Sequence, residues 1–477
     1  MITSEEMAVV DTNAEALGVP RKQLMESSGN AVARSVRELI DPGSEIAVVC
    51  GRGNNGGDAF VAARFLEAYD VTVHLLGRPE TIATRIAQEN WEALVAADYD
   101  TDVVRDTVDL DLGTPDLIVD AIVGTGVTGA LREPEATAVR AINRTDARVL
   151  AVDVPSGIDA DTGRAAGDAV EADHVVTFHD EKPGLDALDV PVTVADIGIP
   201  DAAALFVERG DLQRLSREPT AHKGDFGSVL VVGGGPYTGA PALSAQAALR
   251  AGADLAYVTA PETITGEIQG YSENLIVRPL PGDRLDPSHV ERLLDLAETV
   301  DTVLVGPGLG DRAATLAAVE SFLEAFDGTA VVDADALRVV PDVETSATLL
   351  CTPHQGELRG MGGPSADEWR RRAELVSAFA DELGHVLLVK GAYDVIAGGD
   401  RHRVNRTGNP GMTVGGTGDV LAGVAAALAC TLDPFDAAAV AAYANGTAGD
   451  IVVEERGYGL LATDLLEALP RSLWPES

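Results

Sequence analysis

Residues 46–68 read IAVVCGRGNNGGDAFVAARFLEA, a pattern that indicates the fold of the first half of the chain. The apolar run IAVVC is typical of a buried strand, and the apolar positions from Phe60 to Leu66 follow a helical period. Between them, Gly51, Gly53 and Gly56 match the G-x-G-x-x-G spacing of a dinucleotide fingerprint. The pattern predicts a glycine turn over residues 51–57 that exposes backbone N–H groups at the start of a helix, where phosphate binds well.

The same fingerprint in a nicotinamide-dependent dehydrogenase requires an acidic residue roughly 20 positions further on, which binds the ribose. Here the second strand, VTVHLLG, ends in Leu76 and Gly77. Asp58 lies inside the turn instead. The signature for hydride transfer is therefore incomplete.

Strand-like runs and helical stretches alternate along both halves of the chain, which predicts an α/β fold with doubly wound parallel sheets. The first series runs from EIAVVC to VPVTVADIG, and the second from SVLVVGGG to HVLLVKGAYDVIAG. A charged, turn-rich stretch, VERGDLQRLSREPTAHKGDFG, separates them. We expect two domains, residues 1–210 and 211–477, each an αβα sandwich, and the first of them Rossmann-like.

The charge of the chain limits its partners. The formal net charge is -41, and the basic residues are 31 arginines against four lysines, Lys22, Lys182, Lys223 and Lys390. Such a surface repels phosphate backbones and anionic headgroups, so we expect no nucleic-acid or membrane partner. An acidic, lysine-poor surface suggests a halophilic cytoplasm, where counterions screen the repulsion. Three scattered cysteines in apolar runs and the absence of a signal-peptide pattern also predict a cytoplasmic protein.

Polar residues follow several predicted strands of the first domain, where an open α/β sheet binds its ligands. They are Asp120 in DAIVGTG, Asp153 and Ser156 in DVPSGID, and Lys182 in KPGL. With NNGGD at 54–58, these motifs resemble the NAD(P)H-hydrate epimerase family over residues 1–210. Ala59 departs from that pattern, where the family usually has glycine.

The resemblance implies roles for residues of the first domain. Asp153 and Lys182 would be the acid and base of epimerisation, and Asn55, Asp120 and Ser156 would bind a potassium ion. The dinucleotide would contact Asp153 and two segments, made up of Asn54, Asn55, Gly56, Gly57 and Asp58, and of Gly124, Thr125, Gly126, Val127, Thr128, Gly129 and Ala130.

The second domain carries GGTGD at residues 415–419, with a helix expected to begin at Asp419. Bare glycine N–H groups and the positive end of the helix dipole would face an anion there. A carboxylate in such a place is unusual for binding alone. It is useful if Asp419 accepts a proton from an attacking hydroxyl while the amides stabilise a phosphoryl group. An N-cap role for Asp419 is the alternative.

The motifs VGPGLG, VVDADAL, TPHQGEL, VKGAYDV and GNPGMTVGGTGD resemble the ADP-dependent NAD(P)H-hydrate dehydratase family, which has a ribokinase-like fold. Gln355 departs from the family pattern. By this resemblance Asp419 would be the catalytic base. The hydrate would contact Ala240, Gly308 or Gly310, His354 and Asp419. The nucleotide would contact Lys390, Gly391, Ala392, Tyr393, Asp394, Gly415, Gly416, Thr417 and Gly418.

Together the two resemblances imply an enzyme that repairs hydrated NADH and NADPH. The first domain would interconvert the R and S hydrates at C6, and the second would dehydrate the S form with ADP, giving AMP and phosphate. The expected cofactors are potassium in the first domain and Mg²⁺ with ADP in the second, in a homo-oligomer. Two alternatives stay open: a ribokinase-like small-molecule kinase with an unrelated partner domain, and a first domain that binds nucleotides or proteins without catalysis.

Overall fold

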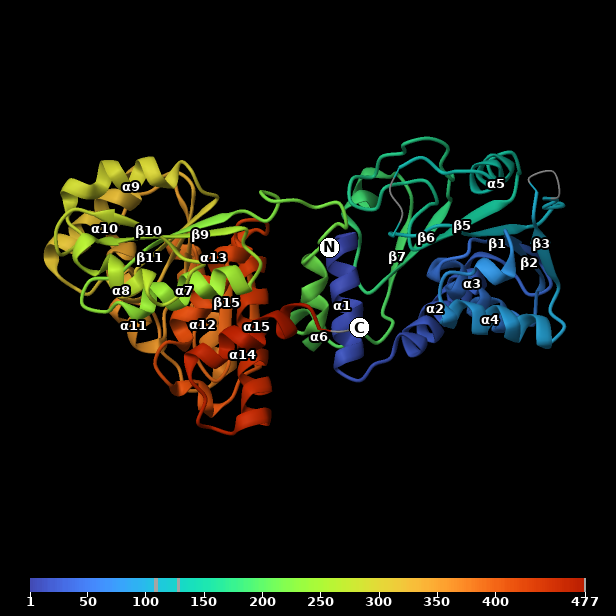
Figure 1. The fold of residues 1–477 in the computed structure, drawn as a ribbon. Coiled ribbons are helices and arrows are strands. Elements are labelled where there is room, and N and C mark those ends of the chain that lie inside the picture. The colour runs from blue at the N-terminus through green and yellow to red at the C-terminus, as the bar shows by residue number, and fades with distance from the viewer. Residues whose placement is uncertain (107–109, 127–128, 476–477) are drawn as a thin grey trace. The chain divides into compact units, whose positions relative to one another are not determined.

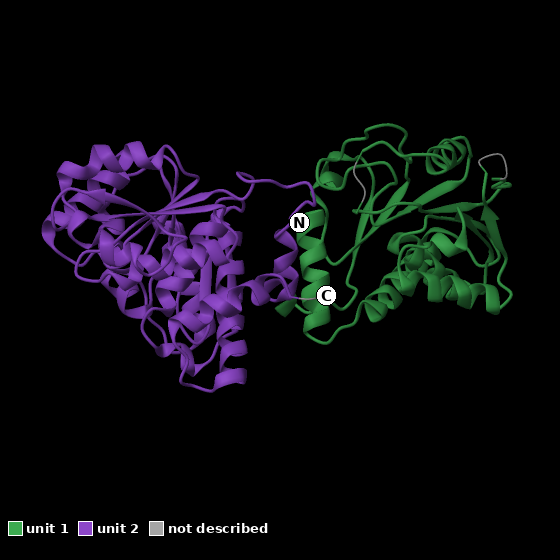
Figure 2. Ribbon diagram, in the orientation of Figure 1, with its two compact units in different colours: residues 1–203 green, residues 204–477 purple. Residues whose placement is uncertain are grey.

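The computed structural model describes residues 1–106, 110–126 and 129–475. The chain forms two compact units, Met1–Ala203 and Ala204–Ser477 (Figure 2). The boundary expected near residue 210 lies in a short 3-10 helix, η4 (Arg209–Arg214), at the beginning of the second unit.

A parallel sheet forms the centre of the first unit, with strand order β3-β2-β1-β4-β5-β6-β7 among the described residues (Figure 1). Its strands are β1 (Glu45–Cys50), β2 (Asp70–Leu76), β3 (Thr101–Val104), β4 (Leu117–Ala121), β5 (Arg148–Val152), β6 (His174–Phe178) and β7 (Val192–Ala195). Its helices are α1 (Ser4–Ala16), α2 (Arg21–Leu39), α3 (Asn54–Arg64), α4 (Arg85–Ala96), α5 (Glu135–Ile142) and, at the boundary between the units, α6 (Ala202–Leu205).

The strands of this sheet are apolar on both faces, and helices pack against each face. All residues of β1 after Glu45 are buried, as expected of a strand covered on both faces. Side chains of α1 to α4 form one apolar cluster with alternate strand residues such as Val48 and Leu75. Ala138, Val139 and Ile142 of α5 form a cluster on the opposite face. The expected doubly wound α/β fold is confirmed.

The second unit contains, over residues 204–475, a nine-stranded sheet of order β10-β9-β8-β11-β12-β13-β14-β15-β16 (Figure 1). Its strands are β8 (Ser228–Val232), β9 (Leu255–Pro261), β10 (Ile276–Leu280), β11 (Thr302–Val305), β12 (Thr329–Val332), β13 (Thr348–Cys351), β14 (Val386–Val389), β15 (Asp394–Gly398) and β16 (Arg401–Asn405). Its helices are α7 (Gly239–Arg250), α8 (Thr265–Gln269), α9 (Val290–Ala297), α10 (Ala313–Ala325), α11 (Gln355–Gly360), α12 (Trp369–Leu383), α13 (Thr417–Leu428), α14 (Pro434–Arg456) and α15 (Ala462–Leu473).

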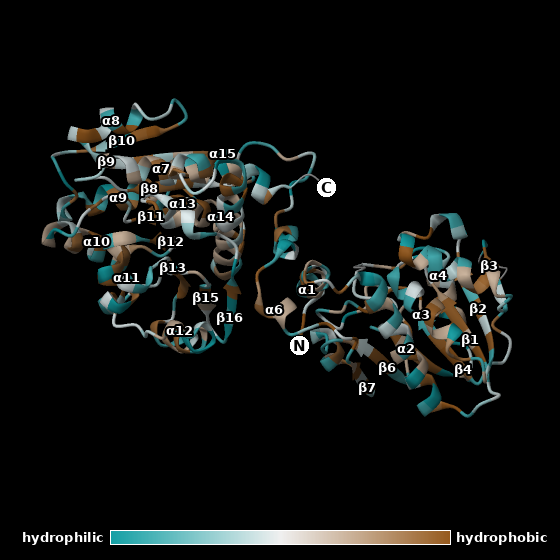
Figure 3. Ribbon diagram, turned by 90° about the horizontal axis from the view of Figure 1, so that it is seen from below, coloured by the Kyte–Doolittle hydropathy of each residue, from teal (hydrophilic) through white to brown (hydrophobic). Residues whose placement is uncertain are grey.

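The two faces of this sheet are covered by different helices. Helices α7, α13, α14 and α15 form the larger apolar cluster, while α9, α10 and α12 pack on the other face. Figure 3 colours each residue by its hydropathy, and every residue of helix α13 from Val420 to Leu428 is buried. A helix that is apolar all round belongs in a core.

Three local predictions differ from the structure. Helix α3 already begins at Asn54, so NNGGD forms its first turn and is no loop. Helix α13 begins at Thr417, two residues before Asp419, after Gly416 in a left-handed conformation. HVLLVKGAYDVIAG is two antiparallel strands, β14 and β15, because Lys390 to Tyr393 form a hairpin turn.

Candidate functional site

The carboxyl end of β1 is the point where the first sheet reverses its strand order, since β1 pairs with both β2 and β4. Such a point is where open α/β sheets bind ligands. A Cβ on Gly51 would lie 1.9 Å from the carbonyl oxygen of Ile122, and one on Gly56 would lie 2.2 Å from the carbonyl oxygen of Gly51. These glycines therefore let the turn pack closely against the end of β4, which is a structural role beside any phosphate contact.

Asn55, Gly124 and Asp153 come together at this edge. A Cβ on Gly124 would lie 3.0 Å from Asp153 Oδ2 and 3.3 Å from Asn55 Cγ. Asp153 follows β5 with a φ of 69°, a conformation that Asp adopts more readily than most residues. Thr125 N donates to Asp153 Oδ2 over 3.2 Å, and Thr177 Oγ1 donates to Oδ1 over 3.2 Å. These two hydrogen bonds fix the carboxylate at the mouth of the site.

Lys182 is the buried neighbour of Asp153. Its side chain is 1% exposed, and Nζ lies 3.6 Å from Asp153 Oδ1. Nζ also donates to the carbonyl oxygens of Phe178 and Asp180, at 2.8 and 3.0 Å. These contacts fix the Lys182 ammonium inside the protein. The carboxylate of Asp153 is 14% exposed, so it is the more accessible group of the pair.

The three residues expected to bind potassium are all buried. Asp120 Oδ1 accepts from Ser156 Oγ over 2.6 Å, and Oδ2 accepts from Ser156 N over 2.8 Å. Burial raises the pKa of Asp120 to about 6, against the effect of these hydrogen bonds. Both polar atoms of the Asn55 side chain are buried without a hydrogen-bond partner. The unpaired amide of Asn55, the carboxylate of Asp120 and the hydroxyl of Ser156 offer oxygen donors of the kind that fits a hard cation.

The other predicted residues of this site line its margin. Asn54 is exposed and accepts a hydrogen bond from Thr84 Oγ1 over 2.7 Å. Gly57 packs against Met25 and Ala87. Gly126, Gly129 and Ala130 belong to an exposed loop, and Gly129 lines a cavity of 290 Å³. Val127 and Thr128 lie outside the described residues.

Sequence reasoning overlooked Asp11 of α1 as a neighbour of this site. Burial, and then the charge of Asp153, raise the pKa of Asp11 to about 6, although Arg21 and Lys182 oppose them. Burial also raises the pKa of Asp58 well above its usual range, with Asp153 and Asp11 adding to the effect. Nothing in the segment around Asp11 marks it as part of the site, because α1 lies far from the other motifs in sequence. Ala59, the departure from the expected pattern, is buried in the core.

In the second unit a cavity of 820 Å³ lies beside the start of α13. Eight of the nine residues predicted to contact a nucleotide line it, namely Lys390, Gly391, Ala392, Asp394, Gly415, Gly416, Thr417 and Gly418. Tyr393 does not, since its ring stacks on Trp369 with the ring centroids 5.1 Å apart. Asp394 holds the hairpin turn by accepting hydrogen bonds from Gly391 N and Asn405 Nδ2, both at 2.9 Å.

Lys390 is held at the glycine-rich end of this cavity. Its Nζ donates to Asp333 Oδ1 over 2.9 Å and lies 3.8 Å from Glu357 Oε2. Burial alone would lower the pKa of Lys390, but the charges of Asp333 and Glu357 outweigh it and raise that pKa. A Cβ on Gly418 would lie 3.3 Å from the ammonium. The cation therefore lies against the backbone at the start of α13.

Asp419 stands in the first turn of α13, beside the same group of charges. Burial, and then the charge of Asp333, raise its pKa to about 7, while Lys390 lowers it. Its backbone carbonyl oxygen accepts a hydrogen bond from Ser244 Oγ of α7 over 2.8 Å. The structure shows no side-chain cap for α13, so the expected alternative role of Asp419 as N-cap is wrong, since that position belongs to Gly416.

His354 follows β13 and caps α11. Its Nδ1 accepts hydrogen bonds from Gly356 N and Glu357 N at 2.9 and 3.0 Å, so Nε2 carries the proton of the neutral ring. The side chain is 60% exposed. It lines both the 820 Å³ cavity and a second cavity of 520 Å³. Of the other predicted hydrate contacts, Gly308 lies beside Ala240, since a Cβ on Gly308 would lie 3.4 Å from Ala240 Cβ. A Cβ on Gly310 would lie 3.0 Å from Pro236.

Asp333 is the chief residue that sequence reasoning missed in this unit. It is 3% exposed, follows β12, and its Oδ1 accepts from both Lys390 Nζ and Thr352 Oγ1. The motif VVDADAL contains it, but its role depends on β12, β13 and β14 being neighbours in the sheet.

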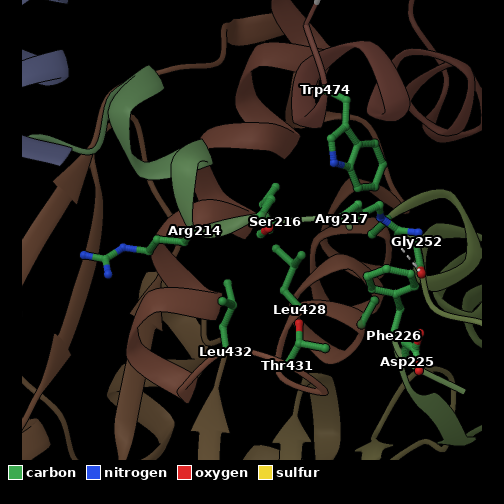
Figure 4. Close-up of a pocket in the computed structure, with 13 residues that line it drawn as sticks. Arg214, Ser216, Arg217, Asp225, Phe226, Gly252, Leu428, Thr431, Leu432 and Trp474 are labelled. Carbon is green, nitrogen blue, oxygen red and sulfur yellow. Dashed lines mark hydrogen bonds between the residues drawn. The ribbon is translucent and has the colours of Figure 1, made fainter. Parts of the chain in front are cut away.

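A separate cavity of 220 Å³ lies at the far end of α13, around Leu428, and holds none of the predicted residues (Figure 4). The guanidinium of Arg217 lies there over the ring of Phe226, at 3.7 Å, and near that of Trp474, at 4.9 Å. Arg217 also donates to the carbonyl oxygen of Gly252 over 2.7 Å. These contacts attach the start of the second unit to its last helices.

No helix within the described residues is both long enough and apolar enough to cross a membrane. No group of three or more His, Cys, Asp and Glu residues in the described ranges is arranged to hold a metal ion.

Comparison with known proteins accounts for nearly the whole chain. Residues 229–471 match a family described as NAD(P)H-hydrate dehydratase, and residues 21–184 match the YjeF-related protein N-terminus. The Bifunctional NAD(P)H-hydrate repair enzyme Nnr of Methanothermobacter thermautotrophicus is 44% identical, over 98% of this chain and 95% of that protein. The protein of the same name from Pyrobaculum aerophilum is 45% identical, over 98% of this chain and 97% of that one.

A solved structure of a hypothetical protein from Streptococcus mutans is also similar. It has a TM-score of 0.50 at 23% identity and covers 56% of this chain and 98% of that chain, so the likeness concerns the fold alone. The full-length relatives decide the family. The chain belongs to the bifunctional NAD(P)H-hydrate repair enzymes.

Proposed function

We propose that the second unit converts the S hydrates of NADH and NADPH to NAD(P)H at the expense of ADP, and that the first unit interconverts the R and S hydrates at C6. The observation that carries the proposal is Asp419. Its carboxyl group, with a pKa raised to about 7, stands at the start of a buried helix beside Lys390 and an 820 Å³ cavity. The names of the full-length relatives support the same pair of activities.

Dehydration in this scheme needs a better leaving group than hydroxide. Asp419 accepts the proton of the C6 hydroxyl as that oxygen attacks the β-phosphorus of ADP, and AMP leaves. The N–H groups of Gly415 to Gly418 and the Lys390 ammonium stabilise the charge on the phosphoryl group. Loss of phosphate from C6 and of a proton from C5 then restores the double bond. The sum is hydrate plus ADP giving NAD(P)H, AMP and phosphate.

Magnesium is the expected companion of the nucleotide. Mg²⁺ usually binds phosphate oxygens and one or two carboxylates and keeps several waters. Asp333 and Glu357, whose carboxylates lie 2.9 and 3.8 Å from the Lys390 ammonium, could provide one or two carboxylates near the phosphates, which fits that mode of binding. When bound, the ion would neutralise charge on the phosphates.

Epimerisation needs only proton transfer, because C6 of the hydrate carries both a hydroxyl and the ring nitrogen. Asp153 takes the hydroxyl proton as the C6–N bond opens to an aldehyde, and the departing ring nitrogen gains a proton. Both transfers reverse when the nitrogen adds to the other face of the aldehyde. Lys182 supplies a positive charge 3.6 Å from the carboxylate. Asn55, Asp120 and Ser156 would hold potassium, which would orient the substrate beside Asp153. The segments 54–58 and 124–130 would hold the dinucleotide.

Three further properties complete the proposal: a cytoplasmic location, a homo-oligomeric state and adaptation to high salt. The net charge of -41 supports salt adaptation, since counterions reduce the repulsion between carboxylates. A melting temperature that rises with KCl concentration would support it, and one that is independent of salt would refute it. Light scattering measures the oligomeric state.

The test of the proposed function is a return of the dihydronicotinamide absorbance from mixed hydrate epimers. Wild-type protein should restore it fully with ADP and not without nucleotide. The Asp419→Asn variant should restore almost none. A ribokinase-like kinase of another substrate would consume nucleotide without restoring the absorbance.

A further inference from the structure

The 820 Å³ cavity is lined by two chemically different sets of residues. One is the backbone of Gly415 to Gly418 with the Lys390 ammonium, which suits phosphate. The other includes Met412 and three residues of α14, namely Ala442, Asn445 and Gly446. Gly446 packs against Thr407, because a Cβ there would lie 2.2 Å from Thr407 Oγ1. A nucleotide with its phosphates against the first set would have the second set available for its base.

Asn445, in the second set, is a polar residue that needs a hydrogen-bond partner from a ligand. Its side chain is only 6% exposed, and its Oδ1 is buried without a hydrogen-bond partner. Two neighbouring amides differ: Asn405 donates to Asp394 and to the carbonyl oxygen of Ala442, and Asn409 donates to Asp450. Buried polar groups in native proteins are nearly always paired, so an orphaned acceptor in a cavity wall is a sign of a missing donor.

We propose that Asn445 Oδ1 accepts a hydrogen bond from the exocyclic amine of adenine and so selects the base of the nucleotide. A carboxamide matches adenine well, because its oxygen accepts from the N6 amine while its nitrogen can donate to a ring nitrogen. Apolar residues of the same cavity, Met412, Leu421 and Ala442, suit the faces of a purine. This inference rests on the proposed function, since it places the adenosine of ADP in the cavity.

The probe is a pair of nucleotides that differ in one group: ADP, and purine riboside 5′-diphosphate, which has hydrogen in place of the amine. Calorimetry on the full chain should show that wild type prefers ADP by about tenfold, the effect of leaving a buried acceptor unpaired. The Asn445→Leu variant should bind both with equal affinity. The Asn445→Asp variant keeps an acceptor oxygen and should keep the preference.

Binding of the purine nucleotide to Asn445→Leu also shows that this variant is folded. If Asn445→Leu keeps the wild-type preference for ADP, the inference is wrong while nucleotide binding stands. If Asn445→Asp loses the preference as Asn445→Leu does, the accepting oxygen is not the cause, and the inference is again wrong. If wild type binds neither nucleotide, the proposed function fails together with the inference.

Discussion

The replacement Asp419→Asn removes the proposed base with almost no change in size. Asparagine cannot take a proton from the C6 hydroxyl, so kcat/KM for the S hydrate with ADP should fall by about 10²–10⁴-fold, the usual worth of general base catalysis. The affinity for ADP should change little, because the backbone of the 415–418 loop and Lys390 provide the phosphate contacts. The assay is the dihydronicotinamide absorbance, with calorimetry for ADP.

The pH dependence of the wild-type enzyme tests the same residue. Burial and Asp333 raise the pKa of Asp419 to about 7, and a base acts in its ionised form. The ionised fraction is then about one-tenth at pH 6 and about nine-tenths at pH 8, so kcat/KM should rise about tenfold across that range. Lys390 lowers this pKa, so the remaining activity of Lys390→Met should rise at higher pH than that of wild type.

The matched control is Asp381→Asn, an exposed position on α12, which should keep wild-type kcat/KM. If kcat/KM of Asp419→Asn is lower than that of wild type by only about threefold or less, Asp419 is not the base, since loss of a general base should cost far more. The role of Asp419 as base is also refuted if the pH profile of Lys390→Met moves to lower pH.

Three further predictions concern other parts of the chain. Asp153→Asn should slow exchange between the hydrate epimers at least about 10²-fold and leave dehydration of pure S hydrate unchanged, as chromatography of the epimers will show. Asn55→Leu removes the orphaned amide and should abolish any acceleration of epimer exchange by potassium over sodium. Gly423→Ala should lower the free energy of unfolding by about 1–3 kcal/mol in urea titrations, because the new Cβ would lie 2.1 Å from the carbonyl oxygen of Ser244.

Each has a control or a contradicting outcome. Unchanged exchange in Asp153→Asn would remove that residue from catalysis. Equal potassium and sodium rates in wild type would contradict the proposed ion site. Gly266→Ala is the control for Gly423→Ala, since α8 has open space at Gly266; that variant should gain up to about 1 kcal/mol from helix propensity. A Gly423→Ala protein as stable as wild type would mean that α7 and α13 can separate freely.

The sequence was sufficient for features that depend on local pattern. Short apolar runs between glycine turns predicted the parallel sheets, and the strand ends predicted which loops carry Asp153, His354 and Lys390. The expectation that Asp120 follows its strand is wrong, because it lies within β4. Helix starts were less accurate: α3 includes Asn54 because Gly51 and Gly56 pack on backbone, which a sequence pattern alone does not show.

Asp333 could not be predicted, because its role depends on strand order. It follows β12, whereas the predicted residues His354 and Lys390 follow β13 and β14, and only the sheet shows that these three strands are neighbours. Asp11 and Asn445 lie on helices outside every motif, and their significance comes from burial beside a site. A sequence pattern alone does not show which side chains of separate helices lie beside a site in the folded protein.

In the proposed reaction the C6 oxygen of the hydrate leaves as part of phosphate, after transfer of a phosphoryl group from ADP. The direct measurement uses S hydrate with heavy oxygen at the C6 hydroxyl, incubated with ADP and the enzyme, followed by mass spectrometry of the phosphate released. The account predicts one labelled oxygen in each inorganic phosphate and none in water. Label recovered in water, with unlabelled phosphate, would contradict it.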